Sequence, residues 1–463
     1  MKVLSAARDI QRNLPRSLHA FGTNLILLPL GIIGSILIAR SIGPAAKGSL
    51  DLIVATATLL ITFLGLSLPS GVTYVVARGQ ANLRKLVRQL VFIALLQGVI
   101  AAGILAVLRL VGYSSSLIPD SMRAWVIVGV ALYVSFEMLS NHWRSILNGK
   151  LQNVKANNCE LIGRTLYTGA LFLIAALLFV LGKRLSVTVL FVMVVGVTVL
   201  INLLLLRQLY PYLTEAVDEN SRGEVVEHNP IKEVFSFATP SYLGNLAQFL
   251  NYRLDVFIVG IFAGAASVGR YTLAVSLAQL LWMLSNATAT VILPKIAGER
   301  SERNIDHTTR IARLSLFASL IAGIAFAIFA SVALPALYGE AFRPSVHALY
   351  LLLPGIVLFS MVNVLAAYIA GVGSPRLNLY IALAALIVTV TLLLILVPAK
   401  GINGAAIASS ASYSLSTILT VTVFLRMTGR SLRTLVFPTM DDVRLLGSIF
   451  EPFLRHVRPQ QAG

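Results

Sequence analysis

The sequence is poor in charged residues and almost without cysteine. Only 12% of its 463 residues are charged, 57% are hydrophobic and the mean hydropathy is +0.84. A soluble protein has about 25% charged residues, so this composition excludes an ordinary soluble domain and indicates a polytopic membrane protein. Cys159 is the only cysteine, so neither an intramolecular disulfide nor a cysteine metal cluster can form.

Sequence motifs of covalent chemistry are also missing. The chain has no glycine-rich phosphate loop ending in Lys-Ser/Thr, no His-Glu-x-x-His and no Gly-x-Ser-x-Gly. These motifs carry ATP hydrolysis, zinc proteolysis and serine hydrolysis, respectively. The six histidines are scattered, so no metal site is predicted. We therefore expect a protein that moves a substrate, is not an enzyme and needs no cofactor.

Apolar runs follow one another along most of the chain. Each is close to the roughly 20 residues that an α-helix needs to cross a bilayer. They predict an all-α membrane protein of about 12 spans, at 18–41, 49–77, 87–112, 123–147, 156–182, 185–208, 236–262, 268–297, 308–337, 345–371, 376–398 and 403–427.

A polar interval at 210–232 divides these runs into two sets of six. It predicts an N-terminal six-helix lobe at 1–209, a cytoplasmic linker at 210–232, a C-terminal six-helix lobe at 233–427 and a cytoplasmic tail at 428–463. Apolar side chains between Val436 and Leu454 suggest one interfacial helix in the tail.

Basic residues set the predicted orientation. The net charge is +18, and with both ends inside, the cytoplasmic segments hold roughly three times as many Lys and Arg residues as the external ones. We therefore predict cytoplasmic termini. The charge indicates membrane topology and contact with membrane lipid or an anionic ligand, not nucleic-acid binding.

The chain also repeats internally. Gly43-Pro-Ala-Ala-Lys-Gly48 follows the first span, and Gly264-Ala-Ala-Ser-Val-Gly269 follows the seventh, 221 residues later. Chance similarity of short glycine-rich turns is the alternative. Because each repeat holds six spans, the two halves enter the membrane in the same sense.

Polar residues in the seventh span form the first candidate site. Asn245, Gln248, Tyr252 and Asp255 recur at helical spacing and share one face, which Arg253 flanks. Ionisable groups within a membrane span must face a protein or water-filled interior. One interpretation is a substrate-binding face on which Arg253 offers a forked donor to phosphate. The other is a structural Arg253–Asp255 pair, or partners on another helix.

The fourth span carries a second polar stripe. Glu137, Asn141 and Arg144 lie on one helical face. Glu137 is a candidate ion-coupling residue, as is Asp255, or it is a structural partner for an arginine. Arg144 and Asn141 are candidates for substrate binding, although Arg144 could instead extend to the headgroups. In the fifth span, Glu160 and Arg164 are spaced to form an ordinary ion pair.

Asp51 and Arg270 stand at the predicted external ends of the second and eighth spans. They are either ordinary helix-end charges or groups that gate the external mouth.

Several of these stretches resemble the oligosaccharide flippases, the polysaccharide biosynthesis membrane proteins of the multidrug/oligosaccharidyl-lipid/polysaccharide exporter superfamily. The resemblance covers roughly residues 15–427. It rests on Leu37 to Gly48, on Thr239 to Leu243 and Arg253 to Asp255, and on Gly371-Val-Gly-Ser-Pro-Arg376 with Lys400 to Ala408.

This resemblance implies two six-helix lobes around a central cavity that works by alternating access. In the related lipid II flippases a cationic cavity holds the pyrophosphate, and Arg253 and Arg144 match that role by residue type.

The leading hypothesis is therefore a flippase in the bacterial inner membrane. It would move an undecaprenyl-pyrophosphate-linked oligosaccharide to the external leaflet for polysaccharide biosynthesis, with H⁺ or Na⁺ as a candidate coupling ion. The alternatives are a cation-coupled multidrug antiporter of the same architecture and a non-transporting scaffold for glycan-assembly proteins.

Overall fold

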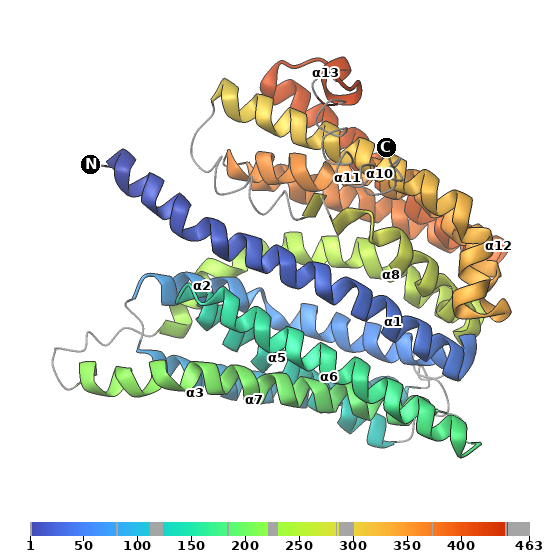
Figure 1. Cartoon of the computed structure of the whole chain (residues 1–463), viewed down its shortest axis with the longest axis horizontal. Helices are drawn as coiled ribbons and strands as arrows, with labels where there is room; N and C mark the ends of the chain where they lie inside the picture. Colours follow the sequence, from blue (N-terminus) through green and yellow to red (C-terminus); the bar gives the residue numbers. More distant parts are fainter. Residues whose placement is uncertain are drawn as a thin grey trace, which may run out of the picture. The chain divides into compact units, whose positions relative to one another are not determined.

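The described part of the computed structural model is built of helices (Figure 1). None of the residues that it describes lies in a β-strand. The structure describes residues 2–79, 82–111, 124–182, 185–220, 230–283, 285–286, 301–372, 374–439 and 442. The helices are α1 (Lys2–Gly65), α2 (Leu68–Ala77), α3 (Leu83–Leu110), α5 (Ala124–Gly149), α6 (Asn153–Val180), α7 (Val187–Asn220), α8 (Pro230–Gln279), α10 (Glu302–Tyr338), the short 3₁₀ helix η1 (Glu340–Phe342), α11 (Pro344–Gly371), α12 (Pro375–Thr428) and α13 (Leu432–Val436).

The three longest helices are each two spans joined by a glycine turn. Gly43 in α1, Gly264 in α8 and Gly401 in α12 have positive φ angles of 72°, 76° and 55°. In a straight helix, Asp255 and Tyr271 would lie about 24 Å apart along the axis. Instead, the Tyr271 hydroxyl donates a 2.6 Å hydrogen bond to Asp255, so α8 folds back on itself.

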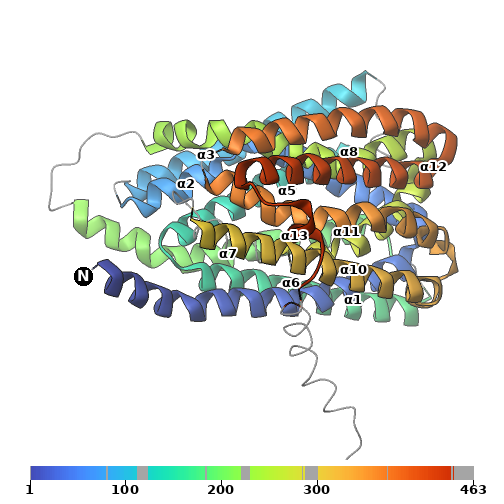
Figure 2. The same ribbon diagram turned by 90° about the horizontal axis from the view of Figure 1, so that it is seen from above.

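The same reversal occurs in α12. The hydroxyl groups of Thr389 and Ser412, on either side of Gly401, are 2.6 Å apart and hydrogen-bonded. Figure 2 shows the two arms of this helix running side by side. Glycine fits such turns because it has no Cβ to clash at positive φ.

The number of spans follows from these turns. Eight helical segments are long and apolar enough to cross a membrane, and three of them, at 27–65, 242–279 and 376–428, contain the glycine turns. They therefore supply eleven spans. The 26-residue helix α5 is the twelfth. The predicted all-helical fold of about twelve spans is confirmed.

Large apolar side chains cover the outer faces of these helices. Val99 of α3, Leu173 of α6 and Ile328 of α10 are each at least 65% exposed. An apolar surface of this extent marks contact with lipid in a polytopic protein.

The chain forms two compact units. Unit 1 contains residues 1–272, 333–345 and 397–402, and unit 2 contains residues 273–332, 346–396 and 403–463. In unit 1, buried aliphatic side chains from α1, α3, α5 and α7 form the core. In unit 2, the Trp282 ring packs on Phe359 and Tyr413 at centroid distances of 4.9 and 5.3 Å. The lobe boundaries expected at 209 and 233 stay a prediction. The linker expected at 210–232 is helical as far as Asn220, where α7 ends.

Equivalent turns of the internal repeat touch each other in unit 1. A Cβ on Gly48 would overlap the carbonyl oxygen of Ala265, and one on Gly269 would overlap that of Pro44. These pairs are reciprocal, because Pro44 and Ala265, like Gly48 and Gly269, are 221 residues apart. Reciprocal contacts of this kind are typical of two repeats related by a two-fold axis.

Contacts between helix ends agree with the predicted alternation of sides. In unit 1, Arg78 after α2 pairs with Glu233 of α8 at 2.8 Å, and Arg84 of α3 donates to the carbonyl of Leu213 in α7. All four residues lie in segments predicted to be cytoplasmic. The predicted external residues Arg40 and Arg270 donate to the carbonyls of Leu337 and Ala341, respectively.

Candidate functional site

The predicted substrate face lies on the first arm of α8, in unit 1. Asn245 is exposed, and Gln248, Tyr252 and Arg253 are half-buried. The side chains of Gln248 and Tyr252 hydrogen-bond to each other one helical turn apart, as their i, i+4 spacing predicts.

This face meets a break in the second span. α1 ends at Gly65 and α2 begins at Leu68, because Leu66 and Ser67 adopt left-handed φ angles of 46° and 53° and Pro69 follows. Proline cannot donate a backbone hydrogen bond, and it favours the first turn of a helix. The second span is thus a discontinuous helix, with polar backbone at membrane depth.

Side chains from two other helices satisfy the polar groups at this break. The Tyr242 hydroxyl donates to the Phe63 carbonyl at 2.8 Å, and the Gln97 amide of α3 donates to the Leu64 carbonyl at 2.7 Å. The Asn245 amide donates to the Ser67 hydroxyl at 3.0 Å. Irregular backbone is tolerated within a membrane where protein or a water-filled cavity surrounds it.

Asp255 lies deeper in the same helix and is only 1% exposed. Its carboxylate accepts hydrogen bonds from the Tyr271 hydroxyl at 2.6 Å and from the Val256 backbone N–H at 2.8 Å. Tyr271 was not a predicted partner. Because the bond from Tyr271 ties the two arms of α8 together, a change of charge on Asp255 would act on the hairpin.

The second predicted stripe forms a charge cluster between α5 and α6. Arg144 pairs with Glu160 at 3.0 Å, and Glu160 also pairs with Arg164 at 2.9 Å. The predicted Glu160–Arg164 pair is confirmed. Arg144 thus turns toward α6, and Arg164, with its side chain 61% exposed, is the more accessible arginine.

Glu137 belongs to the same cluster. It is half-buried and interacts electrostatically with Arg144, Arg164 and Glu160. Asn141, which is also half-buried, lies between Glu137 and Arg144 on the face of α5. The site therefore has an acidic group beside two arginines, within the membrane-spanning part of unit 1.

Asp51 makes contacts more specific than those of an ordinary helix-end charge. It accepts a 2.5 Å hydrogen bond from Lys47, whose side chain is 9% exposed, and another from the Thr272 hydroxyl. Asp51 and Thr272 occupy equivalent positions of the internal repeat, 221 residues apart. The first repeat is thereby linked to the second repeat at the predicted external end of the spans.

The structure thus groups the predicted residues into two clusters of unit 1. One joins the α8 face to the broken second span, and the other joins α5 to α6. Sequence reasoning missed the break at Ser67 and the roles of Gln97 and Tyr271. A single glutamine within the apolar run of α3 is the signal that marks Gln97, but its partner 33 residues away is visible only in the structure.

Two protein-family models match the sequence of this chain. The polysaccharide biosynthesis protein model matches residues 19–298, which is more than half of the chain. The chain belongs to the polysaccharide biosynthesis protein family. The model of the lipid II flippase MurJ matches residues 168–443. The chain is therefore a multi-pass membrane protein of a flippase family.

Similarity to a curated relative is more limited. The chain is 22% identical over 192 residues to the probable low-salt glycan biosynthesis flippase Agl15 of Haloferax volcanii. This alignment spans 41% of the chain and 41% of that relative.

Solved structures share the fold over nearly the whole chain. A multidrug resistance MATE family transporter in an inward-facing conformation matches with a TM-score of 0.67 and 15% identity, covering 89% of this chain and 98% of that one. Lipid II flippase MurJ in an inward closed conformation matches with a TM-score of 0.65 and 14% identity, covering 96% and 93%. At these identities the likeness shows the fold alone.

Proposed function

We propose that the chain flips a lipid-linked oligosaccharide, with an undecaprenyl-pyrophosphate anchor, from the cytoplasmic to the external leaflet of a bacterial inner membrane. Both termini are cytoplasmic in this proposal. The family supports flippase activity. The observation that carries the choice of a phosphorylated glycan is the polar face of α8, which Arg253 flanks and on which Asn245 bonds to the broken helix and Gln248 bonds to Tyr252.

The chemistry of this face fits such a substrate. Sugar hydroxyls need both donors and acceptors, which Asn245 and Gln248 supply. A pyrophosphate needs a cation, and the planar guanidinium of Arg253 presents a fork of N–H donors to it. The apolar exterior of the helices leaves the lipid chain in the bilayer while the headgroup crosses.

Alternating access is the proposed mechanism. The reciprocal Gly48–Gly269 packing and the Lys47–Asp51–Thr272 group hold the two repeats together at one end. Opening that end requires these contacts to separate. The broken second span, whose two parts are joined by left-handed residues, is a natural point of bending.

The test is a flipping assay with the purified chain in liposomes. The substrate is an undecaprenyl-pyrophosphate oligosaccharide, and its arrival in the opposite leaflet is detected by a glycosidase that cannot enter the vesicle. We expect Arg253→Ala to reduce the rate by at least about tenfold, because a charge-assisted hydrogen bond to phosphate contributes roughly 1.5–3 kcal/mol. Arg253→Lys, which keeps the charge without the fork, should retain an intermediate rate.

Arg109→Ala is the matched control, because Arg109 is an exposed arginine in the last turn of α3. An inserted and folded Arg253→Ala protein that flips at the wild-type rate would remove Arg253 from the site. Wild-type protein that exports cationic dyes but does not flip the glycan lipid would support the multidrug antiporter instead.

Ion coupling through Glu137 and Asp255 is the second part of the proposal. Glu137 lies beside two arginines, and Asp255 joins the arms of α8, so uptake of a cation at either changes contacts between helices. We expect Glu137→Gln or Asp255→Asn to abolish the dependence of flipping on an imposed H⁺ or Na⁺ gradient. If both variants respond to the gradients as the wild type does, neither residue couples the ion.

A further inference from the structure

A pocket lined by polar residues lies in unit 2, between the N-terminal part of α10 and the segment that follows α12. Its volume is about 330 Å³. Arginines from both segments line it, Arg310 and Arg313 from α10 and Arg430 from beyond α12. The remaining lining residues are threonines and aspartates, so every residue that lines the pocket carries a polar group.

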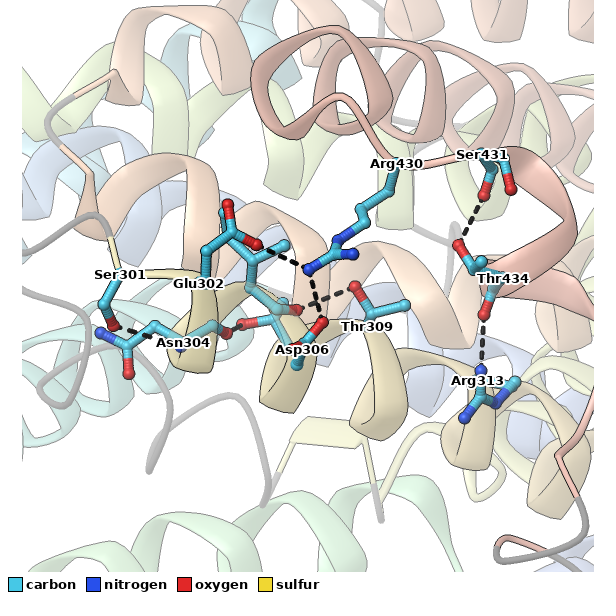
Figure 3. A network of polar contacts seen from close by, with 11 residues as sticks. Ser301, Glu302, Asn304, Asp306, Thr309, Arg313, Arg430, Ser431 and Thr434 are labelled. Carbon is cyan, nitrogen blue, oxygen red and sulfur yellow. Dashed lines mark hydrogen bonds and ion pairs between the residues drawn. The ribbon is translucent and has the colours of Figure 1, made fainter.

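Reciprocal ion pairs hold the two walls together. Arg430 reaches the carboxylates of Glu302 and Asp306, both at 2.7 Å, as Figure 3 shows. In the opposite direction, Asp442 accepts from Arg313 at 2.5 Å and lies 3.2 Å from Arg310. Each segment thus contributes both an acid and an arginine, and the arginines are fixed before any ligand arrives.

The arginines are not saturated by these pairs. Arg313 is only 7% exposed, and its terminal nitrogens contact the Thr434 carbonyl and Asp442, while its Nε has no hydrogen-bond partner. The Nε of Arg430 is also buried without a partner. A buried N–H that loses water and gains no acceptor costs about 1–3 kcal/mol. Both unpaired donors belong to arginines that line the pocket, so neither guanidinium uses its full hydrogen-bonding capacity in its ion pairs.

We propose that this pocket binds a phosphate group, carried either by free phosphate or by the headgroup of an anionic lipid. Guanidinium groups bind phosphate with two parallel N–H donors, and three of them surround the space. The pocket-lining carboxylates each pair with an arginine and so do not leave a net negative wall.

Other ligand classes fit less well. An apolar molecule would find no hydrophobic residue among those that line the pocket. Among the described residues, no group of three or more His, Cys, Asp or Glu side chains could hold a metal ion. The site uses residues of unit 2 only and does not depend on the flipping proposed for the α8 face.

The test is calorimetric titration of the full-length chain in phosphatidylcholine nanodiscs with inorganic phosphate, at an ionic strength held constant with chloride. We expect saturable binding. Arg310→Gln should weaken it by about tenfold or more, because one charge-assisted contact is lost. Asp306→Asn should strengthen it, because it removes a negative charge from the wall.

Arg303→Gln is the matched control, because Arg303 is an exposed arginine on the same helix that does not line the pocket. The lipid source is tested in discs that contain phosphatidic acid. If phosphate itself does not bind, phosphatidic acid should raise the thermal stability of the wild type but not that of Arg310→Gln.

Two outcomes would overturn the proposal. One is that neither phosphate nor phosphatidic acid binds, which would leave water as the occupant. The other is that Arg303→Gln weakens binding as much as Arg310→Gln, which would indicate general charge attraction. Arg310→Gln should flip the glycan lipid at the wild-type rate, because Arg310 is not part of the α8 face, so failure of this site and failure of the flipping proposal are distinguishable.

Discussion

At the scale of single residues, glycine determines how closely the two repeats approach. Gly48 and Gly269 each face a backbone carbonyl of the other repeat at a distance that leaves no room for a methyl group. Backbone atoms cannot move aside as a flexible side chain can. The smallest side-chain addition at these positions should therefore force the two turns apart.

We expect Gly48→Ala to lower the free energy of unfolding by about 1–3 kcal/mol, the usual penalty for overpacking a tight contact. Gly103→Ala is the control, because Gly103 lies in α3 with open space around the position of its Cβ. That substitution should be neutral or stabilising by up to about 1 kcal/mol, since alanine favours a helix. Unfolding of the detergent-solubilised protein measures both. Equal stabilities of the two variants would contradict the reciprocal contact.

Charged residues show what sequence reasoning can establish at this scale. Helical spacing predicted that Glu160 meets Arg164, because both lie on one helix. It could not predict that Arg144 joins them, since that contact depends on the packing of α5 against α6. Whether Arg253 and Arg144 hold substrate remains a prediction.

At the scale of elements, the sequence predicts spans better than the turns within them. Apolar length alone predicted about twelve spans, because the bilayer imposes the same length on every helix. The repeat of Gly43 and Gly264 predicted two equivalent turns, and both have the left-handed φ that favours glycine. Residues at the break in the second span are a leucine and a serine, which carry no such signal.

The break in the second span shows why the local sequence pattern is not enough to predict where a helix is interrupted. Leu66 and Ser67 hold unfavourable φ angles because Pro69 follows and because Tyr242, Gln97 and Asn245 satisfy the exposed groups. Those partners lie on two other helices. A local conformation that distant side chains stabilise can be found only after the helices have been placed.

At the scale of the whole molecule, the segment after α12 is a docked part of unit 2. The sequence predicted a cytoplasmic tail from residue 428 with one interfacial helix, and most of the residues proposed for that helix lie outside the described part of the chain. The described residues show a short helix, α13, and the buried Asp442. The docking depends on charge pairs between segments more than 100 residues apart, such as Arg430 with Glu302, for which composition gives no signal.

Asp442 makes this docking stable across the physiological pH range. Burial raises the pKa of its carboxyl, but hydrogen bonds from the Thr439 N–H and hydroxyl, together with Arg313, outweigh burial and hold the pKa below its ordinary value. A carboxyl with a lowered folded pKa stabilises the folded state at any pH above its unfolded pKa of about 3.9. That stabilisation is lost only as the pH falls through the lower, folded pKa, so no release is expected between about pH 5 and pH 8.

Substitution that removes the charge of Asp442 should release the C-terminal segment, whereas a pH change between about 5 and 8 should not. Asp442→Asn leaves Arg313 buried without a charge partner, and breaking a buried pair in this way costs about 3–5 kcal/mol. We expect limited proteolysis at pH 7 to cleave this variant beyond Arg430 at least about tenfold faster than the wild type, since each 1.4 kcal/mol of docking energy changes the open fraction tenfold. Asp306→Asn is the control with the same chemistry, because Asp306 forms an exposed pair worth at most about 1 kcal/mol. Equal cleavage of both variants would show that Asp442 does not hold the segment, whereas faster cleavage of Asp442→Asn alone would identify the carboxylate that keeps the C-terminal segment on α10.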